Sequence, residues 1–434
     1  MGIIGSWDSA WMLLGVMLLL LALGMRVCYA LLAVGLIGTM YVLTPAQPAS
    51  VGREMWESIK SYSLTAIPLF VLMAEILMRA DVTSAAYKGF ASFLGPVPGG
   101  AAYANVAGST VFAAISGSSV ANAASLGTLA APAMIDLGFS RPLTFGSIAA
   151  GGTLGILMPP STAMIIYGSL TGVSVGQLFM AGVVPALVLA LLFAVVVLVW
   201  SLLVPADAPR SKKASRAELV SGAMALFPIL VLIGVVLGGI YAGIFTPTEA
   251  AGAGVAVAVV LAAFKRKLTF KVLWEAAEAT TSLSSMILLI IAGAAVVTYV
   301  IGMMSLPAAL TVWIAQLGFS ASTVLILLAV VYVVLGLFIE SISLIVLTVP
   351  VVFPVMKSLG VDGVWLGIYV VILIEIGLIT PPVGLNLYVL QRIPAGQTMG
   401  DIIRGAAPFM VALAALLVLI VAFPGIVTWL PSKS

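Results

Sequence analysis

Two short stretches decide the fold of this chain: Gly155-Ile156-Leu157-Met158-Pro159-Pro160 and Gly377-Leu378-Ile379-Thr380-Pro381-Pro382. Each stretch interrupts a long apolar segment, and the two lie 222 residues apart. Proline lacks a backbone N–H and its ring clashes with the carbonyl four residues earlier, so a Pro-Pro pair breaks a helix. We therefore expect two broken helices, at about residues 141–171 and 363–391, with the carbonyls of Gly155 and Gly377 freed from their helical partners.

The composition places the chain in a lipid bilayer. Only 8% of the 434 residues are charged, 63% are hydrophobic, and the mean hydropathy is +1.28. A soluble domain carries about 25% charged and 45–50% apolar residues. No charged residue occurs within 89–135, 142–206 or 279–339, so these stretches must cross or re-enter the membrane. We predict an all-α polytopic membrane protein with about a dozen hydrophobic segments.

The net charge, the single cysteine and the first hydrophobic stretch exclude several other kinds of protein. The net charge is only +3 and the cations are scattered, so nucleic acid is not an expected partner. The single cysteine, Cys28, lies in an apolar segment and is predicted to be a packing residue. The hydrophobic stretch 11–24 follows Asp8 without a basic region, so we expect a retained helix rather than a signal peptide.

The offset between the Pro-Pro pairs extends to other motifs. Serine-rich stretches at 114–119 and 338–343 precede the two pairs by about 40 residues, and Gly-x-x-Pro motifs follow at 182–185 and 405–408. Such fixed spacing indicates an internal repeat. Five crossings are predicted between the serine-rich stretches: 141–171, 176–204, 217–240, 247–264 and 283–304. Because five is odd, the serine-rich stretches must enter from opposite faces, which is the inverted-topology architecture of many secondary transporters.

Each serine-rich stretch is predicted to be the tip of a re-entrant helical hairpin, at about 101–137 and 321–356. Two full membrane helices would barely fit in the first of these segments at about 1.5 Å per residue, and a re-entrant hairpin fits better. The resulting division of the chain is N-terminal transmembrane helices (1–52), repeat 1 (53–204), a cytoplasmic basic loop with connecting scaffold helices (205–270) and repeat 2 (271–434).

Basic clusters orient the chain, because Lys and Arg gather on the cytoplasmic side. The clusters comprise Arg210, Lys212, Lys213, Arg216, Lys265, Arg266, Lys267 and Lys271. The turn 243–249 is then external, with Thr246 or Thr248 as a helix cap and Glu249 in the first turn. Both termini should be periplasmic in a bacterial inner membrane, with Arg53 and Lys60 as exceptions to the rule.

The hairpin tips and broken helices together predict cation sites. Sodium prefers oxygen ligands, and a freed carbonyl beside serine hydroxyls provides them. The predicted sodium ligands of the first half are Ser116, Ser118, Ser119, Asn122, Gly155, Met158 and Pro160. Those of the second half are Ser341, Ser343, Gly377, Thr380 and Pro382. We expect about two sodium ions, with close packing and kinking as the alternative role for each single residue.

The sequence does not define a substrate, although polar residues near the breaks are candidates for contacting one. These candidates are Ser118, Ser119, Ser161, Ser343 and Asn386. Three acids, Glu75, Glu340 and Glu375, lie in otherwise apolar segments, where an acid is a functional hypothesis by default. Glu340 and Glu375 either tune ion or substrate binding or pair structurally with a backbone donor or a serine.

Four motifs carry a resemblance to a known family: AAISGSSVA at 113–121, GGTLGILMPPS at 151–161, GIFTPTEA at 243–250 and EIGLITPPVGLN at 375–386. In these motifs, in this order, and over nearly its whole length, the chain resembles the large membrane subunit of TRAP transporters, the tripartite ATP-independent periplasmic family. The resemblance implies sodium-driven uptake of an organic acid, such as a C4-dicarboxylate, sialic acid or a similar carboxylate. It also implies an elevator motion of the hairpins and broken helices against a scaffold.

Two protein partners follow from the resemblance: a periplasmic substrate-binding protein and a small four-helix membrane subunit. We expect the small subunit to be a separate polypeptide, because the first hydrophobic segment begins within about ten residues of Met1. A self-sufficient sodium/carboxylate symporter and a passive channel are the alternatives. An enzyme is disfavoured because the chain has no histidine, which removes Ser-His dyads and histidine zinc sites.

Overall fold

The computed structural model describes residues 3–42, 48–210 and 214–433, and its regular elements within these ranges are all helical. In chain order they are α1 (Ile3–Ala22), α2 (Val27–Val42), α3 (Pro48–Ile59), η1 (Tyr62–Thr65), α4 (Ala66–Arg79), α5 (Val82–Leu94), α6 (Gly100–Ser116), α7 (Ser119–Asp136), α8 (Arg141–Leu157), α9 (Thr162–Thr171), α10 (Val175–Leu203), η2 (Pro205–Asp207), α11 (Arg216–Ile233), η3 (Gly234–Gly238), α12 (Gly239–Tyr241), α13 (Pro247–Phe264), α14 (Phe270–Met303), α15 (Leu306–Gln316), α16 (Ala321–Gly336), α17 (Ser341–Ser358), α18 (Gly363–Ile379), α19 (Leu385–Gln391), α20 (Met399–Ala422), α21 (Gly425–Thr428) and η4 (Pro431–Lys433).

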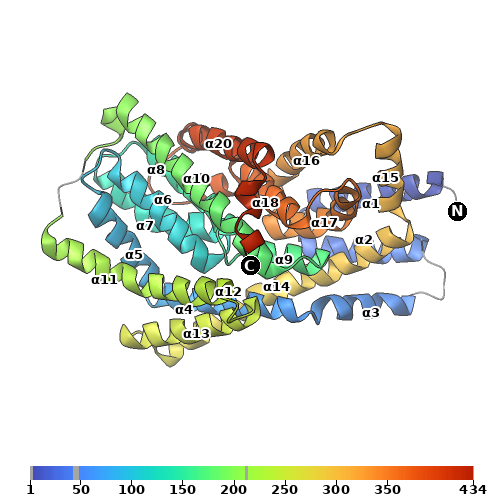
Figure 1. Ribbon diagram of the computed structural model, residues 1–434, viewed down its shortest axis with the longest axis horizontal. Helices are drawn as coiled ribbons and strands as arrows, with labels where there is room; N and C mark the ends of the chain where they lie inside the picture. The colour runs from blue at the N-terminus through green and yellow to red at the C-terminus, as the bar shows by residue number, and fades with distance from the viewer. Residues whose placement is uncertain (1–2, 43–47, 211–213, 434) are drawn as a thin grey trace.

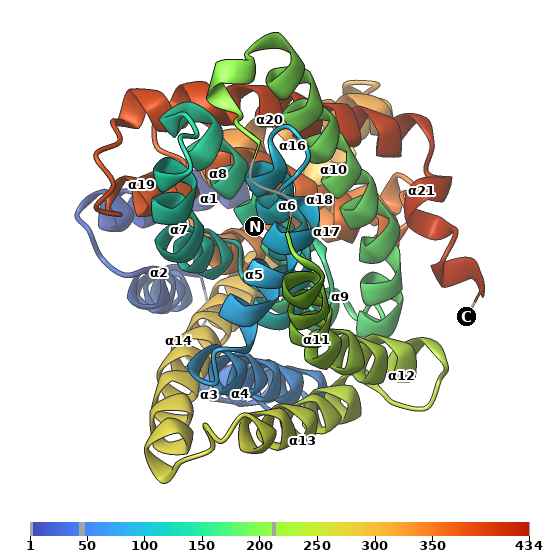
Figure 2. The same cartoon turned by 90° about the vertical axis from the view of Figure 1, so that its left-hand side faces the viewer.

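The helices confirm a polytopic membrane protein. Among the described residues, eight helical stretches are long and apolar enough to cross a membrane, and five shorter apolar helices accompany them. The molecule is elongated: α5 to α8 lie toward one end and α15 to α17 toward the other, with α9 and α18 between them (Figure 1). Below α6 to α8 lie the helices α3, α4, α13 and α14 (Figure 2), and α4 packs against both α13 and α14.

Both Pro-Pro pairs interrupt a helix, as the sequence predicts. The helix α8 ends at Leu157 and α9 begins at Thr162, while α18 ends at Ile379 and α19 begins at Leu385. Both Pro-Pro peptide bonds are cis. The first interrupted helix lies in the protein interior, where α8 packs against α6, α7, α10, α18 and α20. An irregular backbone at membrane depth is tolerated only in such protein-lined surroundings.

Each serine-rich stretch joins two helices. Gly117 has a positive φ of 58° and turns the chain between α6 and α7, where the Ser118 hydroxyl caps α7 by accepting from the Ala121 N–H at 3.4 Å. In the second half, Glu340 precedes α17 as its N-cap. Helix α7 lies against both α6 and α8, whereas α16 packs chiefly on α18 and α17 on α9.

The remaining boundaries test several expectations. Thr246 rather than Thr248 caps α13, and it forms a reciprocal capping box with Glu249. The predicted fifth crossing, 283–304, lies within the longer helix α14, which begins at Phe270. The Thr269 hydroxyl caps α14 at its start, where it accepts from the Val272 N–H at 3.2 Å. Lys212 and Lys213 lie outside the described residues.

Two further predictions concern single residues. Cys28 is buried, as expected of a packing residue, and its thiol is free. Glu75 pairs with Arg79 one helical turn later, and the Arg79 Nε lies 3.6 Å from Glu275 on α14. Glu75 therefore has a structural partner, and the Arg79 guanidinium connects α4 to α14.

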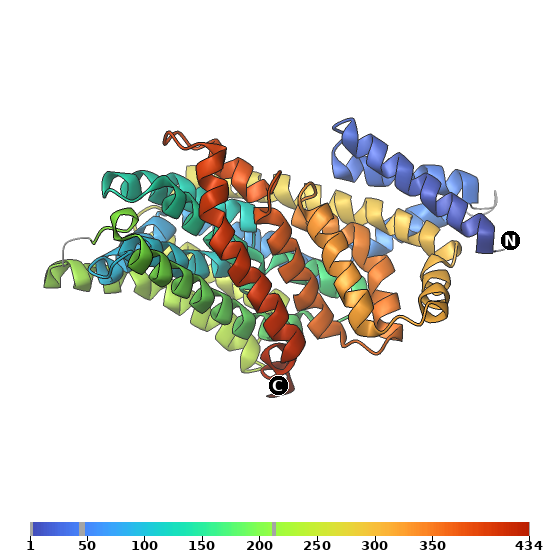
Figure 3. The same cartoon turned by 90° about the horizontal axis from the view of Figure 1, so that it is seen from above.

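The long helix α20 crosses over α8 (Figure 3), and glycines make the crossing possible. A Cβ added at Gly405 would collide with the carbonyl oxygen of Pro142, and one at Gly146 would collide with the backbone of Gly405. Such stripes of small residues let membrane helices approach at backbone distance.

We predict that Gly405→Ala destabilises the protein by about 1–3 kcal/mol, because the methyl group forces α8 and α20 apart. The measurement is the apparent Tm of the purified protein in detergent. Gly302→Ala is the matched control, since nothing lies within 4 Å of an added Cβ at that helical position. Equal Tm values for the two variants would show that the crossing is not tightly packed.

Candidate functional site

The turn at Gly117 lies directly against the first helix break. The Thr162 hydroxyl donates to the Gly117 carbonyl at 3.0 Å. A Cβ added at Gly155 would lie 2.5 Å from the Ser118 carbonyl oxygen, and one added at Gly117 would lie 3.0 Å from that of Pro160. The structure thus brings together the two parts of the first predicted sodium shell, which come from segments about 40 residues apart.

Buried polar groups surround this contact. The Asn122 side chain is fully buried, and its Nδ2 donates to the carbonyls of Ser109 at 3.2 Å and Gly151 at 3.1 Å. Its Oδ1 has no hydrogen-bond partner among the described residues. The Ser116 hydroxyl donates to the Ser118 carbonyl at 3.4 Å. A buried oxygen without a partner is unusual and needs an explanation such as a bound water or ion.

One hydrogen bond connects the two halves of the chain at this place. The Asn386 Nδ2, on α19 after the second break, donates to the Ser119 hydroxyl at 2.9 Å. Asn386 is fully buried and its Oδ1 has no partner among the described residues. Two of the candidate substrate contacts are therefore neighbours, although 267 residues separate them in sequence.

Two other residues near the first break have local partners. Ser161 is fully buried and caps α9, where its hydroxyl accepts from the Met164 N–H at 3.5 Å. Met158 adopts an extended backbone after α8, and its N–H donates to the Leu154 carbonyl at 3.0 Å. Ser161 therefore acts as a cap here, and its hydroxyl is already engaged.

The second break is organised differently. The expectation that the Gly377 carbonyl is free is wrong, because it accepts from the Thr380 N–H at 3.2 Å in a tight final turn. The Thr380 hydroxyl donates to the Ile376 carbonyl at 2.6 Å. Gly377 packs on Gly336 so closely that a Cβ at Gly377 would lie 2.8 Å from the Gly336 Cα. The end of α16 thus packs on α18 directly before the second break.

The second serine cluster begins α17. Ser341 and Ser343 are buried, and their hydroxyls form no hydrogen bond within the described part of the chain. The Glu340 carboxylate accepts from the N–H groups of Ile342 at 3.0 Å and Ser343 at 3.4 Å. Glu340 is therefore a helix cap paired with backbone donors, which is the structural alternative that the sequence left open.

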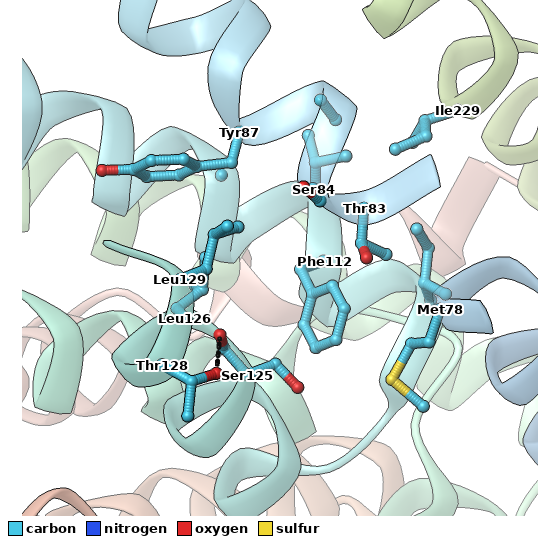
Figure 4. A pocket seen from close by; sticks show the side chains of 14 residues that line it. Met78, Thr83, Ser84, Tyr87, Phe112, Ser125, Leu126, Thr128, Leu129 and Ile229 are labelled. Carbon is cyan, nitrogen blue, oxygen red and sulfur yellow. Dashed lines mark hydrogen bonds between the residues drawn. The ribbon is translucent and has the colours of Figure 1, made fainter. Parts of the chain in front are cut away.

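A cavity of about 220 Å³ lies beside the first helix pair. It lies between α6 and α7 on one side and the end of α4, the start of α5 and part of α11 on the other (Figure 4). Hydroxyl groups of Thr83, Ser84 and Ser125 lie among apolar side chains on its wall. Ile115, which also lines the cavity, immediately precedes Ser116, so the cavity reaches the turn between α6 and α7.

Sequence reasoning missed Thr162 and Gly336. Thr162 follows the Pro-Pro-Ser sequence directly, and its hydroxyl at a helix start was a usable signal. Gly336 carried no such signal, because its importance comes only from the approach of α18.

The fold is that of a multi-pass membrane protein with interrupted helices. It is similar to the solved structure of the YdaH transporter from Alcanivorax borkumensis, with a TM-score of 0.65, 15% identity, and coverage of 94% of this chain and 99% of that chain. The family model described as "Tripartite ATP-independent periplasmic transporter, DctM component" matches residues 14–426. The chain belongs to this family of TRAP transporter large permeases.

Curated relatives share most of their length with the chain. The C4-dicarboxylate TRAP transporter large permease protein DctM of Pseudomonas aeruginosa is 35% identical, covering 92% of this chain and 94% of the relative. The sialic acid protein SiaM of Vibrio cholerae is 31% identical (95% and 96%), and the ectoine protein TeaC of Halomonas elongata is 30% identical (95% and 96%). Because these relatives are named as permeases, the expectation that the chain is not an enzyme is confirmed.

We predict that Asn386→Ala and Ser119→Ala each lower stability by about 1–3 kcal/mol, the usual loss for a buried polar group left unpaired. Because the two side chains share one hydrogen bond, the double variant should lose clearly less than the sum of the single losses. The measurement is the apparent Tm of all three variants against the unmodified protein. Additive losses would mean that this bond does not couple the halves.

Proposed function

We propose that this chain is the large transmembrane subunit of a sodium-coupled, binding-protein-dependent secondary transporter for uptake of an organic acid. The observation that carries the proposal is the contact of the Gly117–Ser118 turn with the Pro-Pro break at 158–161 in a chain of the TRAP family. This contact gathers neutral oxygens in the membrane interior, where sodium is coordinated in secondary transporters with broken helices.

Two sodium ions bind in this proposal, one at each break. The first uses oxygens of Ser116, Ser118, Ser119, Asn122, Gly155, Met158 and Pro160, mostly carbonyls in the last three residues. The second uses Ser341, Ser343, Gly377, Thr380 and Pro382. The Gly377 carbonyl already accepts from Thr380, so it offers the ion its second lone pair.

The proposed architecture is a pair of inverted repeats working as an elevator. In it, α6–α7 and α16–α17 are re-entrant hairpins that move together with the interrupted helices. Support comes from packing: α8 is enclosed by α6, α7, α10, α18 and α20, while α4 packs against both α13 and α14. The hydroxyl-lined cavity lies at the boundary between α6–α7 and the helices α4, α5 and α11, where relative movement would open a route to the site.

The proposed substrate is a C4-dicarboxylate, sialic acid or a similar carboxylate, by analogy with the relatives. Candidate contacts are Ser118, Ser119, Ser161, Ser343 and Asn386. Among them, Asn386 and Ser119 are already joined by a hydrogen bond, and Asn386 retains an unpartnered amide oxygen.

The proposed setting is a bacterial inner membrane with both termini periplasmic. The basic turn between α13 and α14 is then cytoplasmic. In this turn Lys267 lies 3.3 Å from the Asp81 carboxylate and Lys265 donates to the Asp81 carbonyl at 3.3 Å, which holds the turn against the start of α5.

The proposed partners are tested by reconstitution. In liposomes, this chain should transport only together with its small four-helix subunit and a substrate-loaded periplasmic binding protein. The measurement is sodium-driven uptake of radiolabelled C4-dicarboxylate or sialic acid, with each component omitted in turn. Rapid uptake by this chain alone would instead identify a self-sufficient symporter, and flux without a sodium gradient would identify a channel.

The sodium sites are tested by alanine substitution. Uptake should depend on sodium with a Hill coefficient near two for the two oxygen sites. Ser118→Ala or Ser341→Ala removes one neutral oxygen, at a cost of about 1–3 kcal/mol, so the sodium affinity of that site should fall roughly tenfold to a hundredfold. Ser58→Ala is the control, because its hydroxyl bonds only to the Met55 carbonyl of its own helix. Unchanged sodium dependence in both site variants would refute the assignment.

A further inference from the structure

Glu375 differs from every other acid in the described part of the chain. It lies on α18, two residues before Gly377, and is fully buried. Both carboxylate oxygens lack a hydrogen bond of normal geometry among the described residues, and no lysine or arginine forms an ion pair with it there. A buried carboxylate without any compensating partner is strongly unfavourable.

Glu375 lies beside the last turn of α8. Its carboxyl group faces the backbone N–H of Leu157, the last residue of α8. The carbonyls of Gly155 and Ile156 have no helical donor, because Pro159 and Pro160 follow four residues later. The carboxylate therefore lies beside the last turn of α8, where these two carbonyls also lack a helical donor.

Glu340 serves as an internal comparison, because its carboxylate has hydrogen-bond partners of normal geometry. Its carboxylate lies at the positive end of α17 and accepts two backbone N–H groups. The helices that pack against α18 carry the charged side chains Arg141, Glu340, Lys357, Asp401 and Arg404, and none of these forms an ion pair with Glu375 among the described residues. Arg141 begins α8, whose other end is at Leu157, and Asp401 and Arg404 lie in the first two turns of α20.

We propose that Glu375 is the anionic ligand of a third sodium ion, bound between α18 and the C-terminal end of α8. The proposal rests on the sodium coupling proposed above, and it adds a site with a full negative charge to two sites of neutral oxygens. A cation at this position neutralises the carboxylate and satisfies the free carbonyls of α8 together. Because a charged ligand binds sodium more tightly than neutral oxygens, this site fills first.

The decisive variant is Glu375→Gln, which has nearly the same shape without the charge. Equilibrium binding of radioactive sodium to the purified chain should give three ions per molecule for the unmodified protein and two for Glu375→Gln. The tightest binding phase should be the one that is lost. Glu375→Asp keeps the charge and should retain the third ion with at least tenfold weaker affinity.

A stability measurement separates this role from simple packing. In choline chloride without sodium, Glu375→Gln should have an apparent Tm equal to or above that of the unmodified protein, because the uncompensated charge is gone. Added sodium chloride should then stabilise the variant less than the unmodified protein. A lower Tm in choline chloride, with unchanged sodium binding, would mean that Glu375 is a neutral packing group and would overturn the proposal.

The same binding assay distinguishes this proposal from the function on which it rests. If Ser118→Ala and Ser341→Ala weaken sodium binding but Glu375→Gln does not, only the third site is wrong. If Glu375→Gln alone loses an ion, the third site stands and the two oxygen sites are misassigned. Absence of any bound sodium in the unmodified protein would refute sodium coupling and the third site together.

Discussion

The interruption of α8 by Pro159-Pro160 is the constraint on which the rest of this structure depends. A broken helix inside a membrane leaves backbone groups without partners, and lipid offers none. The chain meets this constraint by enclosing the break in protein and by placing the Gly117 turn directly on it. The close approach requires glycine on both sides, at positions 117 and 155, because a side chain would meet backbone atoms there.

The same packing brings the two halves of the chain together at the first break. The second interrupted helix lies directly against the first half of the chain, since α18 packs against α8 and α19 packs against α7. Asn386 therefore reaches Ser119, and Glu375 reaches the end of α8. An ion or substrate bound at either break would thus lie near elements of both halves. Such shared contacts are a physical basis for coupling ion binding to substrate binding.

Three acids in apolar segments show how position on a helix determines their role. Glu75 pairs with Arg79 one turn away, and Glu340 caps α17 with two backbone N–H groups. Within the described part of the chain, Glu375 has no cation beside it and no hydrogen bond of normal geometry, and it faces the Leu157 backbone in the last turn of α8. The side chains are chemically equal, so the local field of backbone dipoles and the distance to a cation account for the difference.

The sequence by itself determined what depends on local chemistry. The breaks at both Pro-Pro pairs, the turn within 114–119 and a helix cap at Thr246 or Thr248 each involve residues within about one helical turn, so local sequence predicts them. The tertiary structure alone decided the bond between Asn386 and Ser119, the cover that Gly336 gives to Gly377, and the contrasting surroundings of Glu340 and Glu375. These depend on how helices rotate and approach across hundreds of residues, and no local pattern encodes that approach.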